Sequence, residues 1–344
     1  MTGIRRGLAT VVFIAGLLGM HAAGRADPVE DFYHGRRMTM LIGYGPGSLY
    51  DLYARLLIRY LPRYIPGHPT IVPENMPGAS SLSATNYLFN VAKRDGSVIG
   101  AFHERMGLEP KVEPKGTRYD GRAFNWIGSM QRQVSVCVTW ATTGIRTVDD
   151  MKRREVIGGG SDVAGSSAVF PRLMNSLLGT RIRLVTGYDA SQIDLALERG
   201  EVDARCGAGW AGIKVQHPDW IRQHKIAIPV QFSLKPHPEL TDVPTLYPLV
   251  ADASDRQALE VMFATADMGK PYAAPPGVPP ERVQALRHAF DQAMTDESLI
   301  SEAAQNQLEL GALSGDAIEA MLVRLYALPD SIYRKLAGWR APPG

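Results

Sequence analysis

Short apolar runs alternate along this chain with longer segments whose apolar residues recur at helical spacing. The run at 38–42 is apolar almost throughout, which is typical of a strand covered on both faces. From Asp51 to Pro62 the apolar residues follow a helical period, and this pattern predicts a helix. Further strands are predicted at 70–72 and 98–102, with a helix at 82–91 between them. This alternation predicts a parallel sheet with helices on its faces.

The pattern changes between Trp126 and Trp140, where 134–138 is rich in β-branched residues and no helix precedes it. We interpret this run as a crossover into a second domain that repeats the first in outline. Strands are predicted there at 156–157, 182–185 and 202–206, helices at 168–178 and 191–199, and a return strand at 230–232. Later helices are predicted near 283–294 and 316–328. We therefore expect an α/β protein in which 27–130 plus 233–344 form domain 1 and 131–232 form domain 2, each a mostly parallel sheet flanked by helices, with hinges near 130–135 and 229–233.

Each predicted domain has a loop of small residues at the carboxyl end of a strand. The first runs from Gly43 to Tyr50, and the second spans 158–167. Free N–H groups and the positive dipole end at a helix start favour a bound anion. Ligands of open α/β sheets bind at this end of the strands. The two loops are therefore predicted to face each other across a cleft and to hold an anion.

Composition and targeting signals narrow the function. A formal net charge of +2 provides no strong positive electrostatic field to attract nucleic acid, so a nucleic-acid partner is disfavoured. Residues 1–26 carry Arg5 and Arg6, an apolar run and then small residues, which is typical of a cleaved secretory signal peptide. In the resulting periplasmic setting Cys137 and Cys206 form a single disulfide or remain two buried thiols, and the sequence leaves both alternatives open.

The motifs of catalysis and cofactor binding are incomplete. The first glycine loop lacks the last glycine of the dinucleotide fingerprint, and no Gly-Lys-Ser/Thr follows either loop. His103-Glu104 begins like a zinc-protease motif, but Gly107 stands where the second histidine must be. We therefore expect no cofactor, no metal and no enzymatic activity. The alternative of an exported hydrolase that uses a loop serine stays open.

Several short motifs, taken in their order along the chain, resemble those of a known protein family. They are the Pro-Gly loop before an Asp-led helix that continues Ala54-Arg55-Leu56-Leu57, then Glu74-Asn75-Met76-Pro77-Gly78-Ala79, Asp95-Gly96 before a strand, the segment 195–203, and 275–282. Together they resemble the solute-binding receptors of tripartite tricarboxylate transporters, also called Bug-type receptors. Each motif is weak alone, but the ordered set covers nearly the whole chain after the signal peptide.

The resemblance implies a monomeric type II periplasmic binding protein, or Venus flytrap. Such a protein closes its cleft on a small organic carboxylate and presents it to the subunits of a membrane permease. The ligand residues implied for domain 1 are Tyr44, Gly45, Pro46, Gly47, Ser48, Leu49, Tyr50 and Asp51, with Pro77, Gly78, Ala79 and Ser80. Those implied for domain 2 are Gly160, Ser161, Gly165, Ser166 and Ser167, with Tyr188, Asp189 and Ala190.

The chain departs from the usual family pattern around these loops. Tyr44 precedes the first loop, Tyr50 replaces a later glycine, and serines stand at 80–81 where glycines are frequent. The tyrosines predict either stacking on an aromatic or longer carboxylate, or packing against the domain. Asp189 would repel a second carboxylate. A sensor that feeds a membrane histidine kinase is a further alternative.

Overall fold

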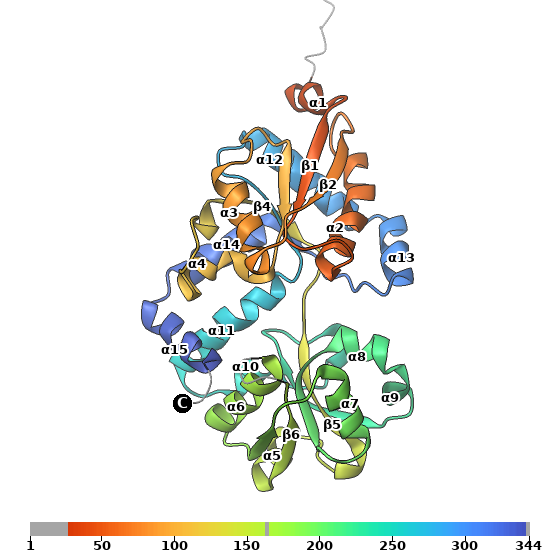
Figure 1. The fold of residues 1–344 in the computed structure, drawn as a ribbon, viewed down its shortest axis with the longest axis vertical. Helices are drawn as coiled ribbons and strands as arrows, with labels where there is room; N and C mark the ends of the chain where they lie inside the picture. Colours follow the sequence, from red (N-terminus) through yellow and green to blue (C-terminus); the bar gives the residue numbers. More distant parts are fainter. Residues whose placement is uncertain (1–26, 162–164, 342–344) are drawn as a thin grey trace, which may run out of the picture.

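The computed structural model describes residues 27–161 and 165–341, which form an upper and a lower lobe along the long axis of the molecule (Figure 1). The predicted signal peptide at 1–26 lies outside the described residues. Within the described ranges no helix has the length and apolar character needed to cross a membrane.

The first lobe is built on a six-stranded sheet in the order β11-β4-β10-β3-β1-β2. Its strands are β1 (Arg37–Ile42), β2 (Thr70–Asn75), β3 (Val98–Ala101), β4 (Asn125–Ser129), β10 (Pro271–Ala274) and β11 (Leu313–Ser314). Apolar residues of α2 (Leu49–Tyr60), α12 (Pro280–Ala293) and α13 (Glu297–Gln305) pack on one face. Those of α3 (Leu82–Asn90) and α14 (Gly315–Tyr326) pack on the other. Two short helices, α1 (Pro28–Tyr33) and α4 (Glu109–Val112), complete the lobe.

The second lobe has a five-stranded sheet in the order β7-β6-β8-β5-β9. Its strands are β5 (Ser135–Trp140), β6 (Val156–Gly159), β7 (Ile182–Val185), β8 (Ala204–Gly209) and β9 (Ile226–Phe232). One face packs on α7 (Ala190–Glu198), α8 (Trp210–Gln216) and α9 (Pro218–Arg222), and the other on α5 (Val148–Arg153), α6 (Ser166–Leu178) and α10 (Leu246–Leu249). A disulfide joins Cys137 of β5 to Cys206 of β8, the first of the two alternatives above.

The predicted two-domain α/β fold is confirmed, but the sheets are mixed rather than mostly parallel. β1 is parallel to β2 and β3, and β6 is parallel to β7 and β8. β10 and β5 are antiparallel to their neighbours. The reason is connectivity: β5 and β10 enter their sheets directly after the chain crosses between the lobes, so both run away from the cleft.

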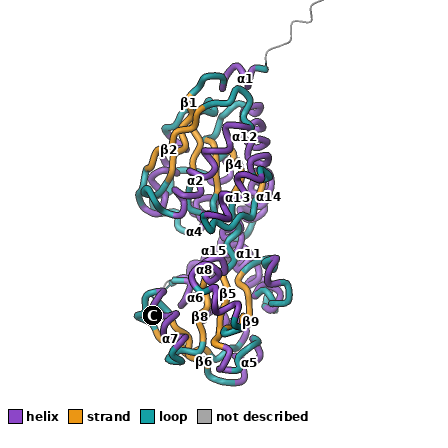
Figure 2. The backbone as a smooth tube through the Cα atoms, turned by 90° about the vertical axis from the view of Figure 1, so that its right-hand side faces the viewer, coloured by secondary structure: helices purple, strands orange, loops and turns teal. Residues whose placement is uncertain are grey.

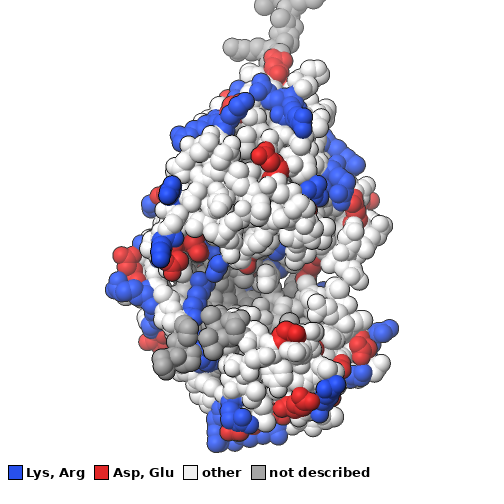
Figure 3. Space-filling view, viewed as in Figure 1, with Lys and Arg blue, Asp and Glu red and all other residues white. Residues whose placement is uncertain are grey.

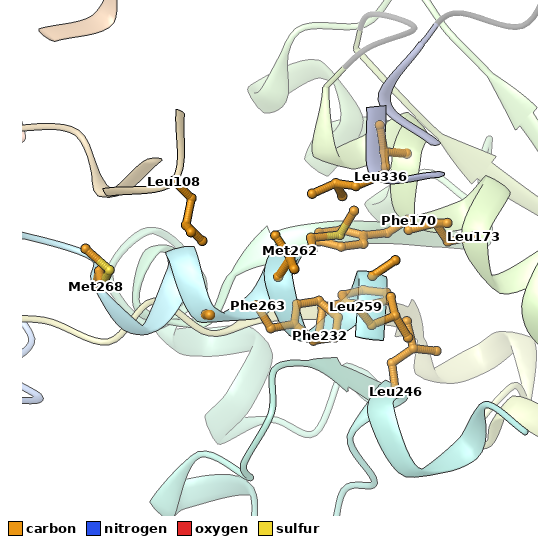
Figure 4. Packing of buried hydrophobic residues seen from close by; sticks show 14 of the residues in the cluster. Leu108, Phe170, Leu173, Phe232, Leu246, Leu259, Met262, Phe263, Met268 and Leu336 are labelled. Carbon is orange, nitrogen blue, oxygen red and sulfur yellow. The ribbon is translucent and has the colours of Figure 1, made fainter. Parts of the chain in front are cut away.

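Helices α11 (Ala253–Asp267) and α15 (Asp330–Arg340) lie between the lobes (Figure 2). Sequence patterns placed the whole of 233–344 in domain 1, whereas α10 packs on β9 of the second sheet. Phe263 of α11 lies near Phe170 of α6, which stacks on Phe232 of β9 with ring centroids 4.1 Å apart (Figure 4). Leu108 of the first lobe belongs to the same apolar cluster. The hydrophobic core is therefore continuous between the lobes.

Candidate functional site

The first predicted ligand loop connects β1 to α2 at the carboxyl end of β1. Ser48 is the N-cap of α2, and its Oγ accepts a hydrogen bond from the Asp51 N–H at 3.3 Å. The helix therefore begins two residues before the predicted start at Asp51, because the serine side chain satisfies a free N–H there. Gly47 adopts a φ of 79°, a left-handed conformation that suits glycine. Leu49 is half exposed beside the loop.

The Asp51 side chain fixes the conformation of this loop through hydrogen bonds. Its carboxylate is buried and accepts hydrogen bonds from Gly47 N at 2.8 Å, Arg55 Nε at 2.8 Å and Asn75 Nδ2 at 2.9 Å. Asn75 also donates to the Tyr44 carbonyl at 2.8 Å. Burial disfavours the charged form, but these donors outweigh it and lower the pKa of Asp51. Asp51 was predicted as a ligand residue. In the structure its carboxylate oxygens accept hydrogen bonds from the protein itself and so fix the loop.

The third loop, 77–81, follows β2 and approaches the first loop closely. Ala79, Ser80 and Ser81 have φ values of 46°, 51° and 78°, so all three are left-handed without being glycine. Ser81 is fully buried, and its Oγ donates to the Gly43 carbonyl at 3.4 Å. A Cβ on Gly43 would lie 2.4 Å from that Oγ. The close approach therefore requires glycine at 43, while Pro77, Ala79 and Ser80 are exposed.

An aromatic and charged cluster backs the first loop. Tyr44 and Tyr50 stack with ring centroids 4.4 Å apart, and His103 lies 5.7 Å from Tyr50. The Tyr50 hydroxyl donates to Glu104, and Lys270 Nζ lies 4.4 Å from the centre of the Tyr50 ring. Burial raises the pKa of Tyr50 far above its usual value and lowers the pKa of Lys270. Both tyrosines thus pack against the domain, which was one of the two alternatives.

The sequence reading missed His103, Glu104 and Lys270 as members of the site. His103 and Glu104 begin two residues after the end of β3, the neighbour of β1, so the rule that sites form at strand carboxyl ends would have found them. Lys270 precedes β10, which enters the sheet beside β3 from distant sequence. No local pattern signals that position.

The facing loop in the second lobe follows β6. Ser167 Oγ accepts a hydrogen bond from Ser161 N at 2.9 Å and lies 3.0 Å from Ser161 Oγ. Gly165 is the N-cap residue of α6, and Ser166 Oγ donates to the Gly207 carbonyl at 3.1 Å. Residues 162–164 of this predicted loop lie outside the described residues. Ser167 is thus a loop-shaping residue whose hydroxyl already has serine partners.

The loop after β7 joins this second loop. Gly187 N donates to the Ser161 carbonyl at 3.0 Å, and Tyr188 N donates to the Gly160 carbonyl at 3.4 Å. Asp189 caps α7: its Oδ1 accepts from Gln192 N at 2.8 Å and from Ser191 Oγ at 2.6 Å. These hydrogen bonds lower the pKa of Asp189, so a capping role explains its charge without reference to a ligand. Ala190 begins the helix.

The predicted residues therefore gather at one place on each lobe, at the carboxyl ends of β1 and β2 and of β6 and β7, although Asp51, Gly160 and Ser167 are buried there. Figure 3 shows the hollow between the lobes on this face. None of the predicted ligand residues is a lysine or an arginine, so the surfaces offer mainly N–H and hydroxyl groups. Among the described residues no group of three or more His, Cys, Asp or Glu side chains is placed to hold a metal ion.

No protein-family model matches the chain, and neither does any curated protein. Solved structures do. A TctC solute-binding protein from Polaromonas is 18% identical, with a TM-score of 0.69 over 88% of this chain and 100% of its own. MatC from Rhodopseudomonas palustris with bound malate is 19% identical, with a TM-score of 0.50 over 88% of this chain and 99% of its own.

A third structure, an R. palustris protein with adipate, is 17% identical, with a TM-score of 0.54 over 88% of this chain and 97% of its own. At such identities the likeness establishes the fold. The resemblance predicted from the sequence is thus confirmed at that level: this chain has the two-domain fold of the TctC-type periplasmic solute-binding proteins.

Proposed function

We propose that this protein is a periplasmic solute-binding protein that captures a small organic carboxylate between its lobes and delivers it to a tripartite tricarboxylate-type permease. The observation that carries the proposal is the pair of small-residue loops after β1 and β6, each leading into a helix N-terminus. Such ends bind anions through N–H groups and the helix dipole. Two proteins of the same fold have malate and adipate bound.

Capture requires no catalysis in this proposal. A carboxylate between the loops would accept hydrogen bonds from both lobes, so the ligand would favour the conformation in which the lobes approach. A dissociation constant of about 1 μM corresponds to about 8 kcal/mol, which several charge-assisted hydrogen bonds and cleft burial supply. The protein would act as a monomer and release its ligand unchanged.

The packing of the site supports a carboxylate without a requirement for an aromatic ring. The Tyr50 hydroxyl donates a hydrogen bond to Glu104, and the Tyr50 ring contacts Tyr44 and Lys270. Asp51 and Asp189 likewise use their carboxylates within the protein. We therefore propose that ligand recognition rests on loop N–H groups and on the hydroxyl protons of Ser48 and Ser167, whose oxygens accept N–H groups within the loops. The tyrosines act as a rigid support.

The test begins with the native protein. Mass spectrometry of material purified without denaturation identifies any retained ligand, and thermal unfolding with malate, adipate, citrate and benzoate ranks carboxylates, since a ligand that binds only the folded state raises Tm. Ser167→Ala should weaken calorimetric binding of the best carboxylate about tenfold, as expected when a hydrogen bond that supports a charged ligand is lost.

The matched control is Ser301→Ala, because Ser301 lies on the exposed side of α13, in the first lobe. It should bind with unchanged affinity. The proposal is wrong if no carboxylate raises Tm and none co-purifies, or if the protein turns a carboxylate ester over instead of retaining its ligand.

A further inference from the structure

A cavity of about 520 Å³ lies between the lobes beside the connecting segments. Its lining includes Arg132 from the β4–β5 connection, Lys235 and His237 from the segment after β9, and Asp267 at the end of α11. The opposite walls come from α8 in the second lobe and from residues 309–312 before β11 in the first. Cavities of this size between domains are common ligand sites.

Several of the charged or polar residues that line the cavity already pair with one another. Glu309 Oε1 lies 2.6 Å from His237 Nε2 and 3.5 Å from Lys214 Nζ. His237 Nδ1 accepts a hydrogen bond from Glu239 N at 3.1 Å, so a neutral His237 carries its proton on Nε2 and donates it to Glu309. Lys214 also pairs with Glu239 at 2.9 Å. These groups need no ligand.

Two other cations that line the cavity, Arg132 and Lys235, lack such partners. The Nε of Arg132 is buried and has no hydrogen-bond partner within the described residues. Lys235 is exposed, and neither Lys235 nor Arg132 forms an ion pair with any side chain in the part of the chain that the structure describes. Asp267 lines the same cavity, and burial raises its pKa although both cations act to lower it. A buried guanidinium N–H without an acceptor is costly, and only this nitrogen of Arg132 is buried in that way.

We propose that this cavity is a second binding site, for a small oxyanion held by Arg132 and Lys235. The planar guanidinium suits two oxygens of one anion, and the lysine ammonium adds a point charge. Asp267 faces the same space and, when protonated, donates a hydrogen bond to an anion oxygen. The shared chemistry is that of phosphate, sulfate and carboxylate groups.

This site is distinct from the proposed carboxylate cleft. None of the residues predicted at the loops after β1, β2, β6 and β7 lines the cavity. The two sites therefore respond to different substitutions. Because residues of both lobes line the cavity, an anion there binds only one range of interlobe angles and so affects ligand capture through linkage.

The experiment is isothermal titration calorimetry of the full protein in Tris chloride near neutral pH, with inorganic phosphate and acetate as separate probes. At least one probe should bind saturably to the unaltered protein. Arg132→Gln and Lys235→Gln should each weaken that binding about tenfold or more, the usual effect of losing a charged hydrogen-bond donor. Phosphate and acetate together distinguish a tetrahedral from a planar oxyanion.

Matched controls are Arg118→Gln and Lys115→Gln, because both side chains are exposed in the first lobe and neither lines the cavity. They should leave binding unchanged. The proposal is overturned if neither probe binds saturably, or if the cavity variants bind as tightly as the controls. Circular dichroism checks folding first, and Lys235→Gln decides the outcome if Arg132→Gln does not fold.

Discussion

At the scale of single residues, Asp51 shows how a charged side chain shapes a binding loop without facing the ligand. Its carboxylate accepts from three donors on three different segments. Asp51→Asn would replace one acceptor oxygen by a donor and leave a buried group unpaired. We expect the free energy of unfolding in urea to fall by about 1–3 kcal/mol. Asp31→Asn on the exposed side of α1 is the control and should change it little.

The hydrogen bonds to the Asp51 carboxylate also make the stability of the protein depend on pH. The pKa of Asp51 is lowered on folding, so its stabilisation is complete above the unfolded value of about 3.9 and is lost as the pH falls through the lower folded value. Urea titrations of the protein and of Asp51→Asn should therefore differ at neutral pH and begin to converge as the pH falls below about 4. A difference that persists in acid would place the effect elsewhere.

Gly43 marks the position where two loops approach most closely. An added Cβ would lie 2.7 Å from the Ser81 Cβ, so Gly43→Ala has to push the loops apart. We expect a loss of about 1–3 kcal/mol in stability and weaker carboxylate binding. Gly45→Ala is the matched control, since nothing lies within 4 Å of a Cβ there. Equal stability of the two variants, measured by urea unfolding, would contradict this account.

Residue roles were the least predictable part of the sequence. The positions of Asp51, Ser167 and Asp189 beside loops followed from strand-end rules, but their partners did not. Each pairs with a group whose identity depends on local geometry: Asn75 for Asp51, Ser161 for Ser167 and Gln192 for Asp189. Of these three contacts, capping by Asp189 was the easiest to predict from the sequence, because Gln192 three residues later completes a capping box.

At the scale of elements, the turn before α3 carries backbone strain. Ser80 is left-handed between two other left-handed residues that are not glycine. Such a conformation costs about 1–2 kcal/mol for an ordinary residue. Ser80→Gly should therefore raise the free energy of unfolding by up to about 1 kcal/mol after the entropy of glycine in the unfolded chain is subtracted.

The control for this turn is Ser83→Gly, one residue into α3, where glycine disfavours the helix and should lower stability by about 0.5–1 kcal/mol. Denaturant titrations of both variants give the comparison. A Ser80→Gly variant that is less stable than the unaltered protein would show that the side chain contributes more than the strain costs.

Most elements near the cleft were predictable because their patterns are local. Strands β1, β3 and β7 and helices α3, α6 and α7 fall within a few residues of their predicted bounds. Helix α11 and strands β10 and β11 were not predicted. β10 is only Pro271–Ala274, and its position between β3 and β4 comes from pairing with strands far away in sequence. Short elements that depend on distant partners carry little periodicity.

At the scale of the whole molecule, the apolar core joins the lobes through α11 and α15. Phe263 is 2% exposed within this continuous cluster. Phe263→Ala should cost about 3–5 kcal/mol. Because the cluster crosses between the lobes, calorimetry should show one unfolding transition that shifts as a unit. Val323→Ala, 64% exposed on α14, should shift it little. Two separate transitions, only one of them affected, would contradict a shared core.

The position of β10 also sets an order of assembly. β10 lies inside the first sheet and separates β4 from β3, yet its residues come late in the chain. The second sheet uses only residues 135–232. A chain that emerges from its amino end can therefore complete the second sheet, with its disulfide, while the first is still in two parts. The lobe that begins the chain is the last to finish.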